Sequence, residues 1–317
     1  MKPKLYIHVS AAAHFLEWEV PLFKQWFDIV SNPSSDAHIL AVGPDVMYEA
    51  AGLPANRRFL VQFPGFGHNP LHNYDLRLQD LALFDEHYDR VFVNPGPLEI
   101  AYSEFSRLTI YPPCVNTKIV PAGRYRTRLD SLLHVSSRTA QKDWQRSAAI
   151  MAKTRLRSEV FPPRNLEFLQ RQSRRANQKS KLLAALRIPH QKPLPLGYVS
   201  HAMTIEKYRK YDGFVHVARD VAHPGMIDGK YTATVMEAAL TGAIIFWHDT
   251  LRLGNSFETI FELPLNTRDA SELIQDVRAS INIEQHSRLT REEFLEKVDP
   301  AKSVRIRAEA MMESIEA

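Results

Sequence analysis

The chain has 317 residues, of which 44% are hydrophobic and 24% charged, a balance typical of a globular protein long enough to form two domains. No apolar run approaches the ~20 residues that cross a bilayer, and we interpret the short alternating N-terminal patch as a strand, not a signal peptide. The formal charge is +4, and the single cysteine, Cys114, excludes an internal disulfide and a cysteine-based zinc cluster. Together these features favour a cytoplasmic protein.

The N-terminal part of the chain alternates between predicted strands and helices. Strands are expected at 5–9, 37–42, 59–63, 90–93 and 108–111, and helices at 19–29, 45–51, 75–86 and 97–105. Such an alternation predicts an α/β domain with a parallel sheet. Pro112 and Pro113 end the last strand, and the polar segment 116–128 is the predicted linker.

The same alternation continues after the linker. Strands are expected at 131–137, 196–199, 213–217 and 243–247, and helices at 142–153, 166–186, 204–211, 232–241, 271–281 and 290–317. We therefore predict two domains, 1–128 and 129–300, followed by a C-terminal helix, 301–317.

Several short motifs follow one another at regular separations. They read IYPPCVNT at 110–117, LLHVSSRTAQKD at 132–143, GYVSH at 197–201, YRKYDGFV at 208–215 and EAALTGAII at 237–245. Together they resemble the motifs of glycosyltransferases of the GT-B fold, particularly the large retaining family 4 of nucleotide-sugar enzymes. The resemblance covers about residues 85–280.

This resemblance implies two Rossmann-like parallel-sheet domains that face a cleft. The first domain would hold the acceptor and the second the nucleotide sugar, and the C-terminal helix would return to pack on the first domain. The implied reaction moves a hexosyl or pentosyl group from a nucleoside diphosphate sugar to a hydroxyl, with retention, and needs no cofactor beyond that donor substrate. No Asp-x-Asp and no HExxH motif occurs, so we predict that the enzyme is metal-independent.

The predicted donor site gathers residues that suit a diphosphate. Arg138 and Lys142 follow the first strand of the second domain, and by resemblance they clamp the diphosphate, although their spacing is one residue shorter than usual. Thr232 and Thr234 open a helix whose free N–H groups favour phosphate. By resemblance, residues Tyr198–His201 would lie near the base. The alternative for Lys142 is an ordinary surface cation at a helix start.

Glu237 matches the second glutamate of the family's Glu-x7-Glu pattern, whose carboxylate accepts hydrogen bonds from the ribose hydroxyls. Thr234 and Glu237 also fit a capping box, which would make the glutamate purely structural. The first glutamate is missing, because Gly229 stands at its position. Either the neighbouring Asp228 replaces it, the sugar differs from the usual hexoses, or the loop has no role in the site.

Candidates for orienting the sugar or the acceptor lie in the first domain. They are His14 and Glu17, in the expected loop after the first strand, and His68 and His72 in the segment FPGFGHNPLHNYD. Gln62 stands where the family has a histidine at a strand end. Each histidine could equally be structural. By resemblance no protein nucleophile is required, because the leaving diphosphate can accept the acceptor's proton.

A basic segment suggests an anionic partner. Residues 153–192 hold eleven Lys or Arg against two acids, and Arg124, Arg126 and Arg128 extend this charge into the linker. The expected helix 166–186 is amphipathic, so the cations could simply form its solvated face. Alternatively they bind DNA, whose hydroxymethylated pyrimidines would be flipped out to accept the sugar. A polysaccharide or lipid-linked glycan acceptor, a sugar epimerase and a non-catalytic nucleic-acid-binding protein remain open alternatives.

Overall fold

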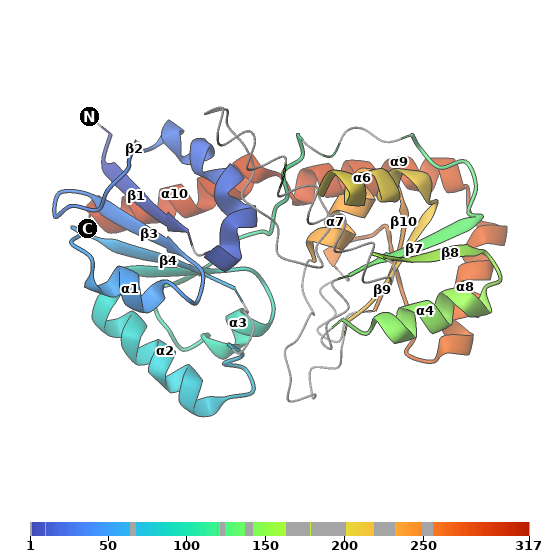
Figure 1. Ribbon diagram of the computed structural model, residues 1–317, viewed down its shortest axis with the longest axis horizontal. Coiled ribbons are helices and arrows are strands. Elements are labelled where there is room, and N and C mark those ends of the chain that lie inside the picture. Colours follow the sequence, from blue (N-terminus) through green and yellow to red (C-terminus); the bar gives the residue numbers. More distant parts are fainter. Residues whose placement is uncertain are drawn as a thin grey trace.

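Two parallel β-sheets lie side by side in the computed structural model, each flanked by helices (Figure 1). The structure describes residues 2–9, 11–63, 68–118, 120, 124–136, 142–162, 178, 201–218, 232–248 and 256–316, with the side chains of 11–16 excepted. Within these residues every strand pairing is parallel, as the strand and helix alternation predicts.

The N-terminal sheet has six strands in the order β2-β1-β3-β4-β5-β6. Its elements are β1 (Lys4–Val9), η1 (Ala11–Gln25), β2 (Asp28–Val30), β3 (His38–Val42), α1 (Met47–Gly52), β4 (Arg58–Gln62), α2 (Tyr74–His87), β5 (Arg90–Val93), α3 (Pro97–Ala101) and β6 (Leu108–Ile110). Successive residues of a strand point to opposite faces, so Leu40 packs under η1 while Ile39 packs under α1 and α2. Both faces are thus covered, which explains the continuous apolar run of β3.

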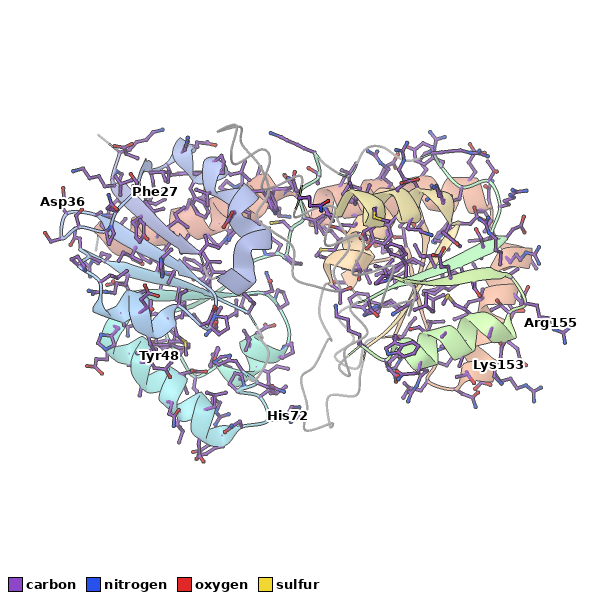
Figure 2. The ribbon with its side chains drawn as sticks, viewed as in Figure 1. Phe27, Asp36, Tyr48, His72, Lys153 and Arg155 are labelled. Atoms are coloured by element: carbon purple, nitrogen blue, oxygen red, sulfur yellow. The ribbon has the colours of Figure 1, made fainter. Side chains whose placement is uncertain are left out.

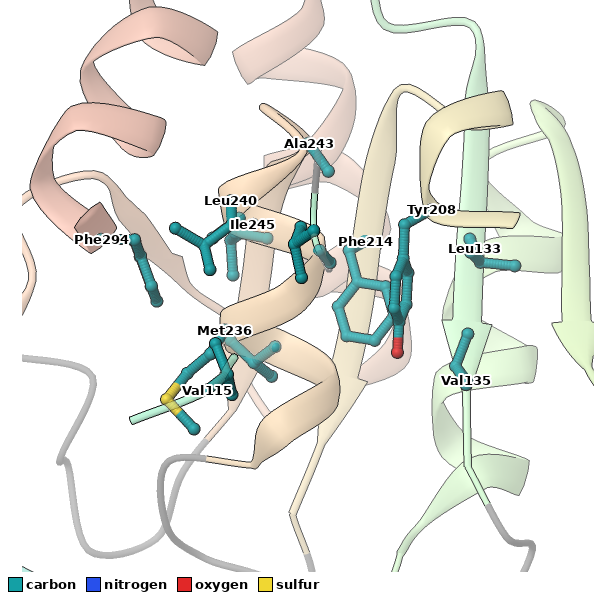
Figure 3. Packing of buried hydrophobic residues seen from close by; sticks show 14 of the residues in the cluster. Val115, Leu133, Val135, Tyr208, Phe214, Met236, Leu240, Ala243, Ile245 and Phe294 are labelled. Carbon is teal, nitrogen blue, oxygen red and sulfur yellow. The ribbon is translucent and has the colours of Figure 1, made fainter. Parts of the chain in front are cut away.

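The C-terminal sheet has five described strands in the order β11-β10-β9-β7-β8. Its elements are β7 (Ser131–Val135), α4 (Trp144–Lys153), β8 (Arg157–Phe161), α6 (His201–Lys210), β9 (Gly213–Val217), α7 (Ala233–Leu240), β10 (Ile244–His248), β11 (Ile260–Glu262), α8 (Thr267–Ser280) and α9 (Ile283–Lys297). One face packs against α6, α7 and α9, as Figure 3 shows for Tyr208, Phe214 and Met236. The other face packs against α4 and α8.

The chain passes twice between the N-terminal sheet and the C-terminal sheet. Tyr111 belongs to a core of the N-terminal sheet, whereas Val115 already belongs to a core of the C-terminal sheet. At the other end, Val298 packs in the C-terminal core, and the last helix, α10 (Pro300–Glu316), returns along the N-terminal sheet (Figure 1). Val304 of α10 is buried in the N-terminal core. The predicted return of the C-terminal helix is therefore confirmed.

Several sequence-based predictions need correction. Residues 28–30 are strand β2, not the end of a helix, and the preceding segment is a 3-10 helix that contains Pro21, which cannot donate to an α-helical ladder. Strands β8 and β11 were not predicted, because edge strands carry exposed and charged residues that hide the apolar pattern. The single helix expected at 290–317 is two helices, since Pro300 starts a new one. The expected helix 166–186 and strand 196–199 lie outside the described residues, Gln178 excepted.

Candidate functional site

The carboxyl ends of the C-terminal strands share one edge of the sheet, where open α/β sheets bind ligands. Strand β9 ends at Val217 and is followed by Ala218, whose backbone forms an isolated antiparallel bridge with Lys142. The chain from Ala218 then leads to Thr232 at the start of α7. Lys142 and the first turn of α7 therefore lie at the same edge, as the proposed diphosphate site requires.

The start of α7 carries two hydroxyl groups. Thr232 is the N-cap, and its hydroxyl accepts a hydrogen bond from the backbone N–H of Val235 at 3.3 Å. The hydroxyl of Thr234 lies 3.1 Å from that of Thr232. The capping box considered for Thr234 and Glu237 is therefore wrong, because Thr234 lies inside the helix and Thr232 caps it. The first-turn N–H groups of α7 point toward the sheet edge, where they favour an anion.

Glu237 and His201 form the most definite contact at this edge. The Nε2 of His201, at the start of α6, lies 2.6 Å from Oε1 of Glu237. The Glu237 side chain is only 10% exposed, whereas that of His201 is 40% exposed. The hydrogen bond to Glu237 outweighs burial and raises the pKa of His201. An almost buried carboxylate is thus held in place by one histidine that solvent can reach.

The hydroxyl of Tyr208 lies in the field of the same carboxylate. Burial, and then the negative charge of Glu237, raises the pKa of Tyr208 well above its ordinary value. The ring packs edge-on against Phe214 with centroids 5.7 Å apart, between α6 and β9 (Figure 3). Tyr208 therefore stays a neutral, buried hydroxyl near Glu237.

The other predicted donor-site residues lie outside the described residues. They are Arg138, Tyr198, Asp228 and Gly229. Of the remaining set, the structure brings His201 into contact with Glu237 and puts Lys142, Thr232 and Thr234 at the same edge. The binding roles of all these residues remain predictions.

His68 of the N-terminal domain lies beside a buried carboxylate. It follows β4 on the way to α2, and its Nε2 is 3.0 Å from Oδ2 of Asp80. Asp80 is fully buried in α2 and also accepts a hydrogen bond from the hydroxyl of Tyr102. The His68 side chain is 12% exposed. A carboxylate in this position can orient the imidazole.

Sequence reasoning missed Asp80, although a signal was present. In the helix 74–87, Asp80 stands four residues before Phe84 and thus on the helix face that packs into the core. An acidic residue at such a position is rarely buried without a partner. That partner, His68, could not be identified from the helix pattern alone.

The other candidates of the N-terminal domain lie at separate places in the structure. His14 lies within η1, not in the expected loop, and its side chain is outside the described set; Glu17 of the same helix is exposed. His72 is exposed, on the side nearest the C-terminal sheet (Figure 2). Gln62 is fully buried, and its Nε2 donates to Sδ of Met47 at 3.2 Å, so it faces the core.

Two features are absent from the described residues. No group of three or more His, Cys, Asp or Glu side chains there is arranged to hold a metal ion. Among the helices that the structure describes, none combines the length and the apolar character needed to span a membrane.

Comparison with solved structures identifies the architecture. The chain is similar to TarM (TM-score 0.57, 11% identity, 93% of this chain and 58% of that chain covered). It is also similar to HepE (Alr3699) of Anabaena, solved with UDP and glucose (TM-score 0.59, 9% identity, 100% of both chains). A third similar structure is AviGT4, a glycosyltransferase involved in avilamycin A biosynthesis (TM-score 0.52, 13% identity, 99% and 97% covered).

These similarities concern the fold. The chain has the GT-B architecture of two parallel-sheet units, and it spans 58% of the length of TarM but the whole of HepE. No protein-family model and no curated protein sequence matches the chain.

Proposed function

We propose that the protein is a glycosyltransferase that takes a sugar from a nucleoside diphosphate sugar. The observation that carries this proposal is the nearly buried Glu237 carboxylate, held by His201 at 2.6 Å, one turn into the helix that begins at the carboxyl edge. The GT-B fold, and the UDP and glucose bound to HepE, support the same function. We also propose residues 1–128 as the acceptor domain and 129–300 as the donor domain.

The donor would bind with its two ends recognised differently. The ribose hydroxyls would donate hydrogen bonds to Glu237, since a carboxylate offers acceptors only. The diphosphate would lie against the first turn of α7, with Thr232 and Thr234, and be neutralised by Lys142 and Arg138. Fixed cations and N–H dipoles stabilise the charge that develops on the diphosphate as the sugar departs.

His201 would share the Glu237 carboxylate with a bound ribose, because an ionised carboxylate accepts several hydrogen bonds. In the free protein it occupies Oε1 of Glu237, one of the two oxygens that the ribose hydroxyls would use. By the family resemblance, Tyr198 and His201 would lie near the base, and Asp228 and Gly229 would contact the transferred sugar.

The transfer itself needs the acceptor hydroxyl on the same face of the sugar as the diphosphate, so that a new C–O bond to the acceptor forms there with the configuration retained. We propose a metal-independent reaction with retention, in which the C–O bond to the diphosphate breaks and the leaving diphosphate takes the acceptor's proton. His68, oriented by Asp80 at 3.0 Å, is the candidate for positioning the acceptor or the sugar, with His14 and His72 as further candidates. We propose a polyanionic acceptor, with hydroxymethylated DNA as the first to test, because residues 153–192 are strongly basic.

Calorimetric titration with UDP and 2′-deoxy-UDP tests the ribose contact. Wild-type protein should bind UDP more tightly, by about ten- to a hundredfold for hydrogen bonds to a charged acceptor. Glu237→Gln should abolish this preference while leaving the affinity for 2′-deoxy-UDP almost unchanged. Glu296→Gln, an exposed change on α9, is the matched control and should behave as wild type. Equal losses for both ligands, or no binding of UDP, GDP, ADP or CDP, would refute the proposal.

A further inference from the structure

A concave region lies at the edge of the C-terminal sheet where β7, β8 and β9 begin, opposite the carboxyl edge. It is a pocket of about 430 Å³, within the size range of small-molecule sites. We refer to it as the basic pocket because six cationic side chains line it: Arg124, Arg126, Arg128, Arg157, Arg209 and Lys210. The strands that separate it from the edge bearing Glu237 are five residues long, on the order of 15 Å.

Arg126 is a buried part of the lining of the basic pocket, and its N–H groups already donate hydrogen bonds within the protein. Its guanidinium is buried and donates to the backbone oxygens of Tyr208 at 2.8 Å, Tyr211 at 2.9 Å and Thr241 at 2.9 Å. These oxygens lie at the C-terminal ends of α6 and α7, where the helix dipoles favour a cation. Burial, with smaller contributions from Arg124 and Arg209, lowers its pKa to about 10. Positive charge is therefore crowded at this edge.

The other arginines of the basic pocket have N–H groups available to donate hydrogen bonds to a ligand. Arg124 and Arg209 are exposed, and within the described part of the chain neither forms an ion pair with a carboxylate. Arg157 uses one N–H on the backbone oxygen of Lys210 at 3.1 Å, and its guanidinium carbon lies over the Tyr211 ring, 4.9 Å from the centroid. A guanidinium fixed in this way presents its remaining donors in one direction.

The two carboxylates of the basic pocket neutralise only part of this positive charge. Oδ2 of Asp212 accepts hydrogen bonds from the hydroxyl of Ser131 at 2.7 Å and the backbone N–H of Asp130 at 3.0 Å. Asp130 pairs with Arg278 at 2.8 Å, outside the basic pocket, and its carboxylate is 3.4 Å from Nε of Arg128. The carboxylates thus organise the start of β7, and their remaining acceptor capacity suits hydroxyl groups.

We propose that the basic pocket binds a small phosphorylated anion that also carries hydroxyl groups, such as a sugar phosphate or a nucleotide. Its phosphoryl oxygens would accept hydrogen bonds from Arg124, Arg157 and Arg209, and its hydroxyls would donate to Asp130. Arginine forks match phosphoryl oxygens in charge and in geometry. This site does not depend on the proposed sugar transfer, because it uses none of the residues of the other sheet edge.

Bound phosphate would join three parts of the chain that come together at the basic pocket. Arg124 belongs to the segment that enters β7 from the N-terminal sheet, Arg209 ends α6 and Arg157 begins β8. Figure 2 shows the neighbouring Lys153 and Arg155 at the end of the C-terminal unit that points away from the N-terminal sheet. The proposed site is therefore reached from solvent at the outer end of the molecule.

Titration of the full chain with inorganic pyrophosphate, read by calorimetry and by hydrogen exchange, tests this proposal. Pyrophosphate should protect the amides of residues 124–131 and 205–212. The double variant Arg124→Ala/Arg209→Ala should lose this protection and about tenfold or more of the corresponding affinity, because each arginine supplies charged hydrogen bonds. The control Lys302→Ala/Arg305→Ala removes two exposed cations of α10 and should bind as wild type.

The outcomes separate this site from the proposed donor site. Protection that persists in Glu237→Gln, or in a chain that binds no nucleoside diphosphate, still supports the basic pocket. Protection confined to residues 232–237, or unchanged affinity in the double variant, overturns it. The proposal also fails if the double variant loses binding of a short DNA duplex while its binding of pyrophosphate is unchanged. Both substituted arginines are exposed, so thermal unfolding should show the double variant to be folded.

Discussion

A buried ion pair fastens the last helix to the N-terminal sheet. Arg307 of α10 donates through Nη2 to Oε2 of Glu19 in η1, 288 positions away. The side chains are 2% and 7% exposed, and the guanidinium lies 4.4 Å from the ring centroid of Tyr111. The thiol of Cys114 donates to the other oxygen of Glu19 at 3.4 Å, and burial, reinforced by Glu19, raises the thiol pKa to about 12.

Arg307→Met tests how much this contact stabilises the return of α10. Among the described residues, the change leaves the buried Glu19 carboxylate with a neutral thiol as its donor, so the expected loss is about 3–5 kcal/mol in the free energy of unfolding. The double variant Glu19→Leu/Arg307→Met removes both charges and should cost much less, because well-packed apolar groups replace a desolvated pair at little net cost. The coupling between the two positions should therefore reach about 3 kcal/mol.

Hydrogen exchange of the α10 amides, with urea unfolding beside it, measures this effect. A loss of ~3 kcal/mol accelerates exchange through local opening on the order of 100-fold. Arg305→Met, at an exposed position of the same helix, is the matched control and should change stability by less than ~0.5 kcal/mol. The reasoning is wrong if Arg307→Met exchanges like the control, or if the double variant is as unstable as the single one.

Three further predictions concern the C-terminal sheet. The pKa of His201 is raised above 6.5, so its pairing with Glu237 should stabilise the fold fully below about pH 6.5 and lose this effect as the pH rises through the raised pKa. Urea unfolding of wild type and His201→Gln at several pH values should therefore show a difference in unfolding free energy that shrinks as the pH rises. A difference that stays constant with pH would contradict this prediction. Gly242 has φ +82°, and an added Cβ would lie 2.9 Å from a serine hydroxyl of α9. Gly242→Ala should therefore cost at least ~1 kcal/mol by the same assay, whereas Gly52→Ala, with open space, should not. Thr232→Ala removes the cap of α7 and should cost about 1 kcal/mol, seen as a lower thermal midpoint; an unchanged midpoint would show that the cap contributes nothing.

The residue pattern by itself determined the class of fold. Apolar runs at 37–42 and 213–217 predicted two of the strands, and β9 was predicted at its observed bounds, 213–217. The start of α7 was likewise predicted within one residue, although the cap considered for Thr234 is made by Thr232. These features depend on neighbours along the chain, which is why they could be predicted before any tertiary contact was known.

Only the tertiary structure decided which side chains meet. His201 and Glu237 are 36 positions apart, and Glu19 and Arg307 are 288 apart. The carboxylate beside His68 belongs to Asp80, on the helix that follows. Periodicity tells which face of an element is buried, but not which partner lies across the core. The basic pocket shows the same limit, since its arginines come from a connecting segment, a helix end and a strand start that are brought together only by the parallel sheet.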